Sequence, residues 1–260
     1  MNRIACFGGV YSNYLALEAA LRDISRRGVD AIYCLGDLGA FGPHPDRVFP
    51  LLHDYGVQCL QGNYDDSVGN QLDDCQCGYT DPRDNHFAQI SYDYTLQNTS
   101  EKNRSFLRGL PKQLMIELGP HRVLLCHGSP RRTNEFLWES TTSTHFLDKL
   151  TCDFEADWIL ATHTGIKWHR PLDAGRGFTN VGVLGRPEND GTTRVWFTIL
   201  NYAKAGITAE FVPVQYDHRR LADAMATEGL PDEFQQTILT GWWTTCLEVL
   251  PAKERRIGRF

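Results

Sequence analysis

The segment from residue 31 to residue 45 constrains the fold of this chain more than any other stretch. Residues 31–35 form an apolar, β-prone run that stops abruptly at Gly36 and Asp37, and a loop rich in glycine and proline follows. This pattern predicts a buried strand with a carboxylate at its carboxyl end. In an open α/β sheet, loops and helix N-termini converge at that edge, and ligands bind there. Asp37 is therefore a candidate site residue, although an isolated Gly-Asp pair can also simply cap a turn.

Three further predicted strands end in the same way, each with a polar side chain directly after an apolar run. The strands cover residues 57–61, 122–126 and 158–161, and the polar side chains are Asn63, His127 and His163. Together with Asp37 they form a mixed set of nitrogen and oxygen donors, which suits Zn²⁺, Mn²⁺, Fe²⁺ or a similar first-row ion. One such histidine alone would more often be structural. Four matching positions predict a metal site.

The four strand ends carry, in this order, the motifs Gly-Asp, Gly-Asn-x-Asp, His-Gly-Ser-Pro and x-His-Thr. With these motifs in this order and spacing, the chain resembles the calcineurin-like metallophosphoesterases. The resemblance covers nearly the whole chain. It is most marked toward the small bacterial phosphodiesterases and dinucleoside-polyphosphate hydrolases, whose markers are similar to residues 36–43, 107–111, 180–185 and 214–217. It implies an α/β fold, a four-layer α/β/β/α sandwich of two mixed sheets flanked by helices. It also implies two metal ions bridged by Asp37.

Two motifs of the family are broken in this chain. Gly9 and Tyr11 stand where the family has its opening Asp-x-His, and Gly165 stands where the family has its last histidine. The resemblance then implies that the first metal keeps only Asp37, whereas the second keeps all four donors named above. Because the losses fall on one site, we expect one divalent transition-metal ion, and a second ion is doubtful. Restoring the three lost ligands is expected to rebuild the first site.

Three residues are candidates to replace the missing ligands. Tyr11 either fills the vacated volume or binds a metal through its phenolate oxygen. Cys75 and Cys77 lie in a polar loop beyond Asn63, and this Cys-x-Cys pair is either a loop feature or a substitute ligand pair.

Four residues are candidates for catalysis. Asp37 holds the metal, and Tyr64 stands where the family has its acid histidine. His44 lies on the loop after Asp37, where it either approaches the substrate or faces solvent. Arg131, next to Arg132, suits bidentate binding of phosphoryl oxygens, and the alternative is a solvated surface pair.

Composition indicates one globular domain over residues 1–260, with a helical C-terminal extension at about 219–260 that docks on the body or on a second subunit of a homo-oligomer. The chain is 42% hydrophobic and 22% charged, with a net charge of −6. No segment clusters enough lysine and arginine for nucleic acid. No apolar run approaches the roughly 20 residues that span a bilayer, and no signal peptide is visible, so we expect a cytoplasmic protein that binds no membrane.

The remaining patterns predict local structure. Most of the eight cysteines lie in apolar runs, so no disulfide framework is expected. Helices are predicted after Asn13, at about 46–55 and at about 103–110, and residues 65–114 are expected to cover the site. Residues 172–214 alternate and are rich in β-branched and aromatic side chains, which predicts successive antiparallel strands of the second sheet.

These features predict a metal-dependent hydrolase, a phosphoesterase or phosphodiesterase that cleaves a small phosphorylated substrate with a metal-activated water. Two alternatives stay open. One is a metal-binding pseudo-enzyme with a regulatory or binding role, and the other is a hydrolase of a non-phosphate bond.

Overall fold

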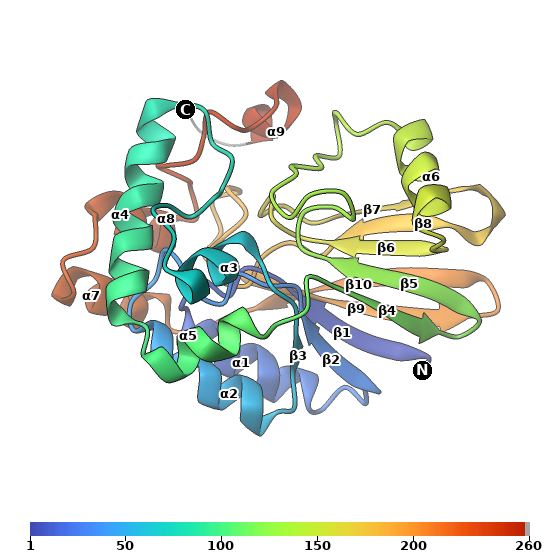
Figure 1. Ribbon diagram of the computed structural model, residues 1–260, viewed down its shortest axis with the longest axis horizontal. Helices are drawn as coiled ribbons and strands as arrows, with labels where there is room; N and C mark the ends of the chain where they lie inside the picture. Colours follow the sequence, from blue (N-terminus) through green and yellow to red (C-terminus); the bar gives the residue numbers. More distant parts are fainter. Residues whose placement is uncertain (258–260) are drawn as a thin grey trace.

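Two five-stranded sheets pack face to face in the computed structural model, which describes residues 1–257 (Figure 1). The first sheet has the order β10 (Gly206–Val214), β9 (Val195–Ala203), β1 (Arg3–Phe7), β2 (Ala31–Cys34) and β3 (Gln58–Cys59). The second has the order β4 (Gln113–Leu118), β5 (His121–Cys126), β6 (Trp158–Ala161), β8 (Gly177–Asn180) and β7 (Trp168–Pro171). Each sheet combines parallel and antiparallel pairs. The predicted pair of mixed sheets flanked by helices is confirmed.

Successive side chains along the strands point alternately into the space between the two sheets and toward the outer helices. In β1, Ile4 and Cys6 face the space between the sheets, whereas Ala5 and Phe7 face the helices. Apolar residues of β2, β4, β5 and β6 fill the same space between the sheets, and they include Tyr33, Leu118, Leu125 and Trp158. The inner layer is therefore a continuous apolar core that holds the two sheets at a fixed distance.

Helices cover both outer faces. α1 (Tyr14–Ile24) and α2 (Val48–Asp54) pack on the first sheet, while α6 (Thr144–Asp153) packs on the second and lies beside β6 and β8 in Figure 1. The predicted helix after Asn13 is confirmed. It begins there because the Asn13 side chain accepts a hydrogen bond from the backbone N–H of Ala16 at 3.0 Å.

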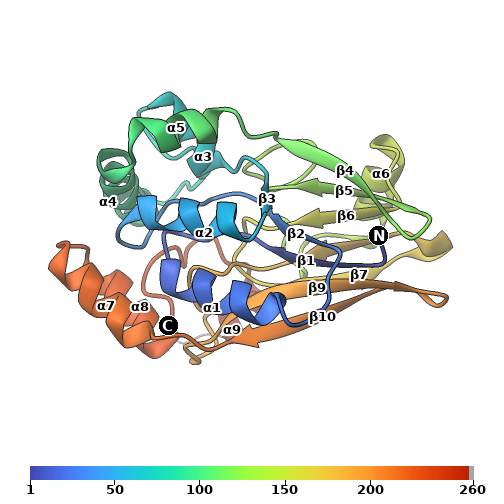
Figure 2. The same cartoon turned by 90° about the horizontal axis from the view of Figure 1, so that it is seen from below.

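The other helices gather mainly at one end of the molecule. They are η1 (Pro45–Arg47), α3 (Asn63–Asn70), α4 (Pro82–Asn98), α5 (Glu101–Arg108), η2 (Asp173–Gly175), α7 (His218–Thr227), α8 (Asp232–Thr240) and α9 (Ala252–Ile257). The helices predicted at about 46–55 and 103–110 correspond to η1 with α2 and to α5. β1 runs from the N-terminus toward the end where α4, α7 and α8 lie (Figure 2). This is the end at which the strand-terminal polar residues meet.

The prediction that residues 172–214 form strands of the second sheet is wrong for two of the three strands in this range, β9 and β10. β8 belongs to the second sheet, but β9 and β10 join the first, where Ile4 pairs with Leu200 across the antiparallel β1–β9 ladder. After β8 the chain crosses through residues 181–194 to the other sheet. Alternation identifies a strand with one buried face, but it does not identify the sheet edge with which that strand pairs.

The prediction that the chain has no disulfide framework needs one correction. Cys75 and Cys77 form a disulfide, and the other six cysteines are free. The loop between α3 and α4 turns back tightly enough to bring two residues so close in sequence into bonding position. Neither thiolate is then free to replace a missing metal ligand.

The C-terminal segment docks on the body of its own chain. Trp243 packs with Trp138 and Leu250, and the buried Glu254 carboxylate accepts a hydrogen bond from the backbone N–H of Ser140 at 3.1 Å. The last three residues of the predicted extension, 258–260, lie outside the described part of the chain. Within residues 1–257, no helix combines the length and the apolar character needed to cross a membrane.

Candidate metal site and cavity

Three of the four predicted metal ligands, Asp37, His127 and His163, meet where the carboxyl ends of the two sheets approach each other. Asp37 follows β2 and Asn63 follows β3 in the first sheet, while His127 follows β5 and His163 follows β6 in the second. All four are buried. One donor atom each from Asp37, His127 and His163 lie within 4.8 Å of one another. The face-to-face packing of the sheets therefore builds a donor cluster from segments far apart in sequence.

Backbone hydrogen bonds fix the loops that carry these donors. The Asp65 carboxylate accepts from the N–H groups of Asp37 at 2.7 Å, Leu38 at 2.9 Å and Gly62 at 2.8 Å. Asp37 and His163 both have left-handed backbone conformations, with φ of +59° and +68°. Such conformations cost energy in residues other than glycine and are common at functional sites. Asp65 was part of the motif identified in the sequence, but its supporting role emerges only from these contacts.

His127 connects the two sheets. Its Nδ1 lies 2.6 Å from the backbone carbonyl oxygen of Leu35, so Nδ1–H donates and Nε2 points into the site. Nε2 lies 3.2 Å from Asp37 Oδ2 and 3.2 Å from His163 Nδ1. At these distances, either a hydrogen-bonding proton or a metal ion lies between Nε2 and its neighbours. The carbonyl behind His127 is the kind of support that orients metal-binding histidines.

The pKa values at the cluster agree with this arrangement. Burial acts to lower the pKa of His127, but the Asp37 carboxylate outweighs it and raises the pKa. Burial acts to raise the pKa of Asp37, but His127 outweighs it and lowers the pKa. Burial and the nearby His127 lower the pKa of His163 to about 3. His163 is therefore a neutral imidazole and Asp37 a carboxylate, the two forms that bind metals.

Two buried polar atoms at the cluster have no hydrogen-bond partner among the described residues. They are Asn63 Oδ1 and His163 Nε2. The amide nitrogen of Asn63 donates to the Cys75 carbonyl oxygen at 2.8 Å, which turns Oδ1 away from that loop. Unpartnered buried polar atoms need an explanation, and an ion is a common one. The donor set of carboxylate, amide oxygen and two imidazoles fits a first-row divalent ion.

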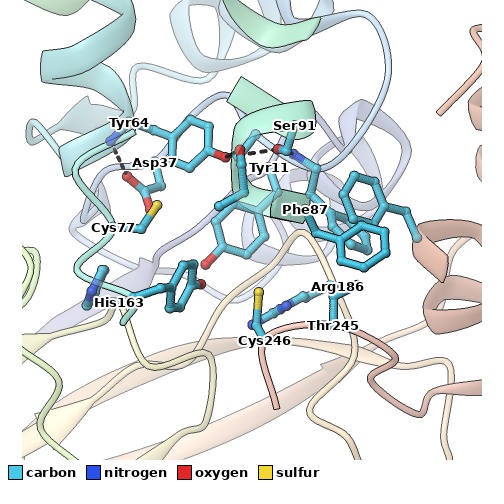
Figure 3. Close-up of a pocket in the computed structure, with 15 residues that line it drawn as sticks. Tyr11, Asp37, Tyr64, Cys77, Phe87, Ser91, His163, Arg186, Thr245 and Cys246 are labelled. Carbon is cyan, nitrogen blue, oxygen red and sulfur yellow. Dashed lines mark hydrogen bonds between the residues drawn. The ribbon is translucent and has the colours of Figure 1, made fainter. Parts of the chain in front are cut away.

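A cavity of about 50 Å³ adjoins Asp37 and His163 (Figure 3). Tyr11, Tyr64, Phe41 and Arg186 also line it, and α4 contributes Phe87, Ala88 and Ser91. The predicted cover over the site is thus partly built by α4. A cavity of this size holds a few water molecules, since roughly 10–15 Å³ suffices for one.

Tyr64 lines the cavity but directs its hydroxyl toward α4. The phenol lies 3.0 Å from Ser91 Oγ and donates to it, as the dashed line in Figure 3 shows. Burial raises the pKa of Tyr64 above its ordinary value, so the phenol is neutral. Its backbone N–H donates to Asp37 Oδ1 at 3.1 Å. Tyr64 thus helps to position Asp37.

His44 and Arg131 do not line the cavity. His44 Nδ1 lies 3.8 Å from Glu228 Oε1, and the Arg131 guanidinium pairs with Glu135. Arg131 pairs with a residue of its own loop. Its closeness to His127 in sequence therefore does not bring its guanidinium to the metal donors. Arg186, by contrast, lines the cavity and was not singled out from the sequence. A lone arginine in a loop between two strands carries no signal of its own.

Comparisons with known proteins agree with this geometry. Residues 3–197 match the family model described as the calcineurin-like phosphoesterase superfamily domain. This chain belongs to that superfamily. It is 25% identical over 252 residues to an uncharacterized protein of Methanocaldococcus jannaschii. The aligned region covers 92% of this chain and 98% of the relative.

Two solved structures share the fold. A hypothetical protein from Pyrococcus horikoshii superposes with a TM-score of 0.78 at 19% identity and covers 94% of this chain and 100% of its own. A metallophosphoesterase from Sphaerobacter thermophilus superposes with a TM-score of 0.70 at 24% identity and covers 92% of this chain and 99% of its own.

Proposed function

We propose that this protein is a metal-dependent phosphoesterase or phosphodiesterase that acts on a small phosphorylated substrate with one divalent ion, such as Mn²⁺, Fe²⁺ or Zn²⁺. The observation that carries the proposal is the buried cluster of Asp37, His127 and His163, with the free amide oxygen of Asn63 beside it. These four residues would hold the ion. When bound, such an ion acts as a Lewis acid and lowers the pKa of a coordinated water.

The residues around the cluster have separate tasks in this proposal. Asp65 and the Leu35 carbonyl hold Asp37 and His127 in place, so the donors need no rearrangement before they bind. The aromatic walls of the cavity limit the access of bulk water and strengthen electrostatic interactions with a bound phosphate. In the overall reaction, a water oxygen adds to phosphorus and a P–O ester bond breaks, which yields an alcohol and a phosphate group.

The size of the cavity supports a small reacting group. The cavity has room for only a few water molecules, so the remainder of a larger substrate would extend toward solvent. We assign His44 and Arg131 no part in this reaction, because their side chains contact Glu228 and Glu135 instead.

Metal analysis and turnover test the proposal together. We expect wild-type protein to bind one equivalent of a transition metal and to hydrolyse bis(p-nitrophenyl) phosphate slowly. The variants Asp37→Ala and His127→Ala should lose both properties, whereas His145→Ala, which changes an exposed histidine, should keep both. Wild-type metal content in both site variants would show that the ligands are misassigned.

A metal-loaded protein that does not hydrolyse the phosphodiester would favour the two alternatives. These are a binding or regulatory protein and a hydrolase of another bond. Both alternatives belong in the test because the family ligands at Gly9, Tyr11 and Gly165 are lost. A panel of carboxylic esters and amides, assayed with the same metal-loaded protein, separates the two.

A further inference from the structure

Arg186 is a buried cation without a carboxylate partner among the described residues. It lies in the loop between β8 and β9 and is only 7% exposed. Its side chain forms a hydrogen bond with Cys246, but its Nε has no hydrogen-bond partner. Its guanidinium lies 3.7 Å from the ring centroid of Trp243, and the rings of Tyr11 and Phe41 are 5.9 and 6.0 Å away. Cation–π contacts offset part of the desolvation cost, but they do not replace an anion.

Arg186 keeps its charge in this setting. A guanidinium is not deprotonated in proteins, and the pKa of Arg186 is raised although its burial acts to lower it. Among the residues that line the cavity, Arg186 is the only one that carries a fixed positive charge. The nearby tyrosines are neutral, because burial raises the pKa of Tyr11 and Tyr64.

The absence of a side chain at Gly165 makes room for this guanidinium. A Cβ placed on Gly165 would lie 3.5 Å from Arg186 Nη2 and 3.1 Å from the Trp243 ring. A histidine at this position would extend into the space that Arg186 and Trp243 fill. Gly165 and His163 are two residues apart, so the guanidinium lies close to the segment that carries a proposed metal ligand.

We propose that Arg186 is the phosphoryl-binding residue of this site and that its guanidinium donates hydrogen bonds to the non-bridging oxygens of a substrate phosphoryl group. This proposal rests on the proposed function, because it assumes that the cavity receives a phosphorylated substrate. Asp37 and His163 lie at one part of the cavity wall and Arg186 at another, with the Tyr11 ring nearby (Figure 3). A guanidinium binds two phosphoryl oxygens at once, and such bonds are strong where water is excluded. A positive charge already in place also stabilises the charge that develops on those oxygens during hydrolysis.

Inorganic phosphate is the probe for this role. We expect calorimetric titration of the metal-loaded, full-length protein to show phosphate binding that Arg186→Met weakens at least tenfold and that Arg186→Lys weakens less. Arg22→Met, which changes an arginine with a 63% exposed side chain, should bind phosphate as the wild type does. Phosphate should raise the melting temperature of the wild type but not that of Arg186→Met.

Stability separates a binding role from a structural one. Methionine keeps the apolar packing against Trp243 and removes a buried charge that has no carboxylate partner, so Arg186→Met should melt at or above the wild-type temperature without phosphate. Undiminished phosphate binding by Arg186→Met would overturn the proposal. If that variant does not fold, Arg186→Lys decides, and wild-type affinity in the lysine variant would count against bidentate binding.

Turnover and phosphate binding together distinguish a failure of this proposal from a failure of the proposed function. Phosphate binding that depends on Arg186 in a protein without turnover would refute the proposed function and support the assignment of Arg186. Equal turnover and equal phosphate binding by the wild type and Arg186→Met would support the proposed function and refute the assignment of Arg186.

Discussion

The carboxylate of Asp65 accepts a hydrogen bond from the backbone N–H of Asp37 at 2.7 Å. The two residues come from neighbouring strand ends of the first sheet. The same carboxylate also accepts from Leu38 and Gly62, so it ties the loop after β2 to the loop after β3. This bond helps to hold Asp37 in its left-handed conformation, in which the side chain faces the two histidines.

Asp65→Asn should therefore destabilise the protein and weaken its metal site. An amide offers one acceptor oxygen, and its NH₂ group would face one of the three backbone N–H donors. We expect the free energy of unfolding to fall by about 1–3 kcal/mol, which is typical when a buried donor loses its partner. Urea unfolding measures the change. Asp66→Asn, at the neighbouring half-exposed position, is the control, and an equal loss there would refute the explanation.

Tyr11 should act by packing and not as a metal ligand. Burial raises the pKa of its phenol even though Arg186 acts to lower it, so a phenolate is disfavoured. Iron-loaded protein purified in air should show no intense visible charge-transfer band, and Tyr11→Phe should leave the spectrum unchanged. A coloured wild type that Tyr11→Phe bleaches, while Tyr64→Phe does not, would establish ligation by Tyr11.

Restoring the three family ligands should destabilise this chain. The sequence suggests that Gly9→Asp, Tyr11→His and Gly165→His together rebuild a second metal site. However, a Cβ on Gly9 would lie 2.5 Å from Val183 Cγ1, and the φ of Gly9 is +48°. The φ of Gly165 is +80°, and a Cβ there would lie 3.1 Å from the Trp243 ring. We expect a lower melting temperature and no gain of a second metal ion in the triple variant, and a stable protein with two ions would contradict this.

His169 should make folding stability depend on pH. Burial lowers its pKa below the usual 6.5, and its Nδ1 lies 2.9 Å from Thr179 Oγ1. The unfolded chain therefore binds this proton at a higher pH than the folded protein does. Stability from this residue is present above about pH 6.5 and is lost as the pH falls through the folded-state pKa.

Denaturant titrations at pH 7.5 and 5.0 measure this effect. His169→Gln should reduce the difference in unfolding free energy between the two pH values. His53→Gln should leave that difference as in the wild type, because the His53 side chain is 90% exposed in the folded protein. An unchanged difference in His169→Gln would mean that other groups cause the pH dependence.

The sequence by itself determined the local pattern of the fold and of the candidate metal ligands. Apolar runs that end in polar residues mark strands and their carboxyl ends, because burial and backbone geometry act over a few residues. Asp37, Asn63, His127 and His163 each lie directly after such a run. Parallel pairing brings Asp37 and Asn63 to one edge of the first sheet, and His127 and His163 to one edge of the second, so these two pairs were predictable. The packing of the sheets against each other then joined the histidines to Asp37.

Only the tertiary structure decided which other side chains reach that edge. β9 and β10 joined the first sheet, Cys75 bonded to Cys77, and Arg131 paired with Glu135 outside the cavity. Arg186 entered the cavity because Gly165 and Trp243, distant in sequence, leave it a place there. Such outcomes depend on contacts between segments far apart in the chain, and local periodicity contains no information about those contacts.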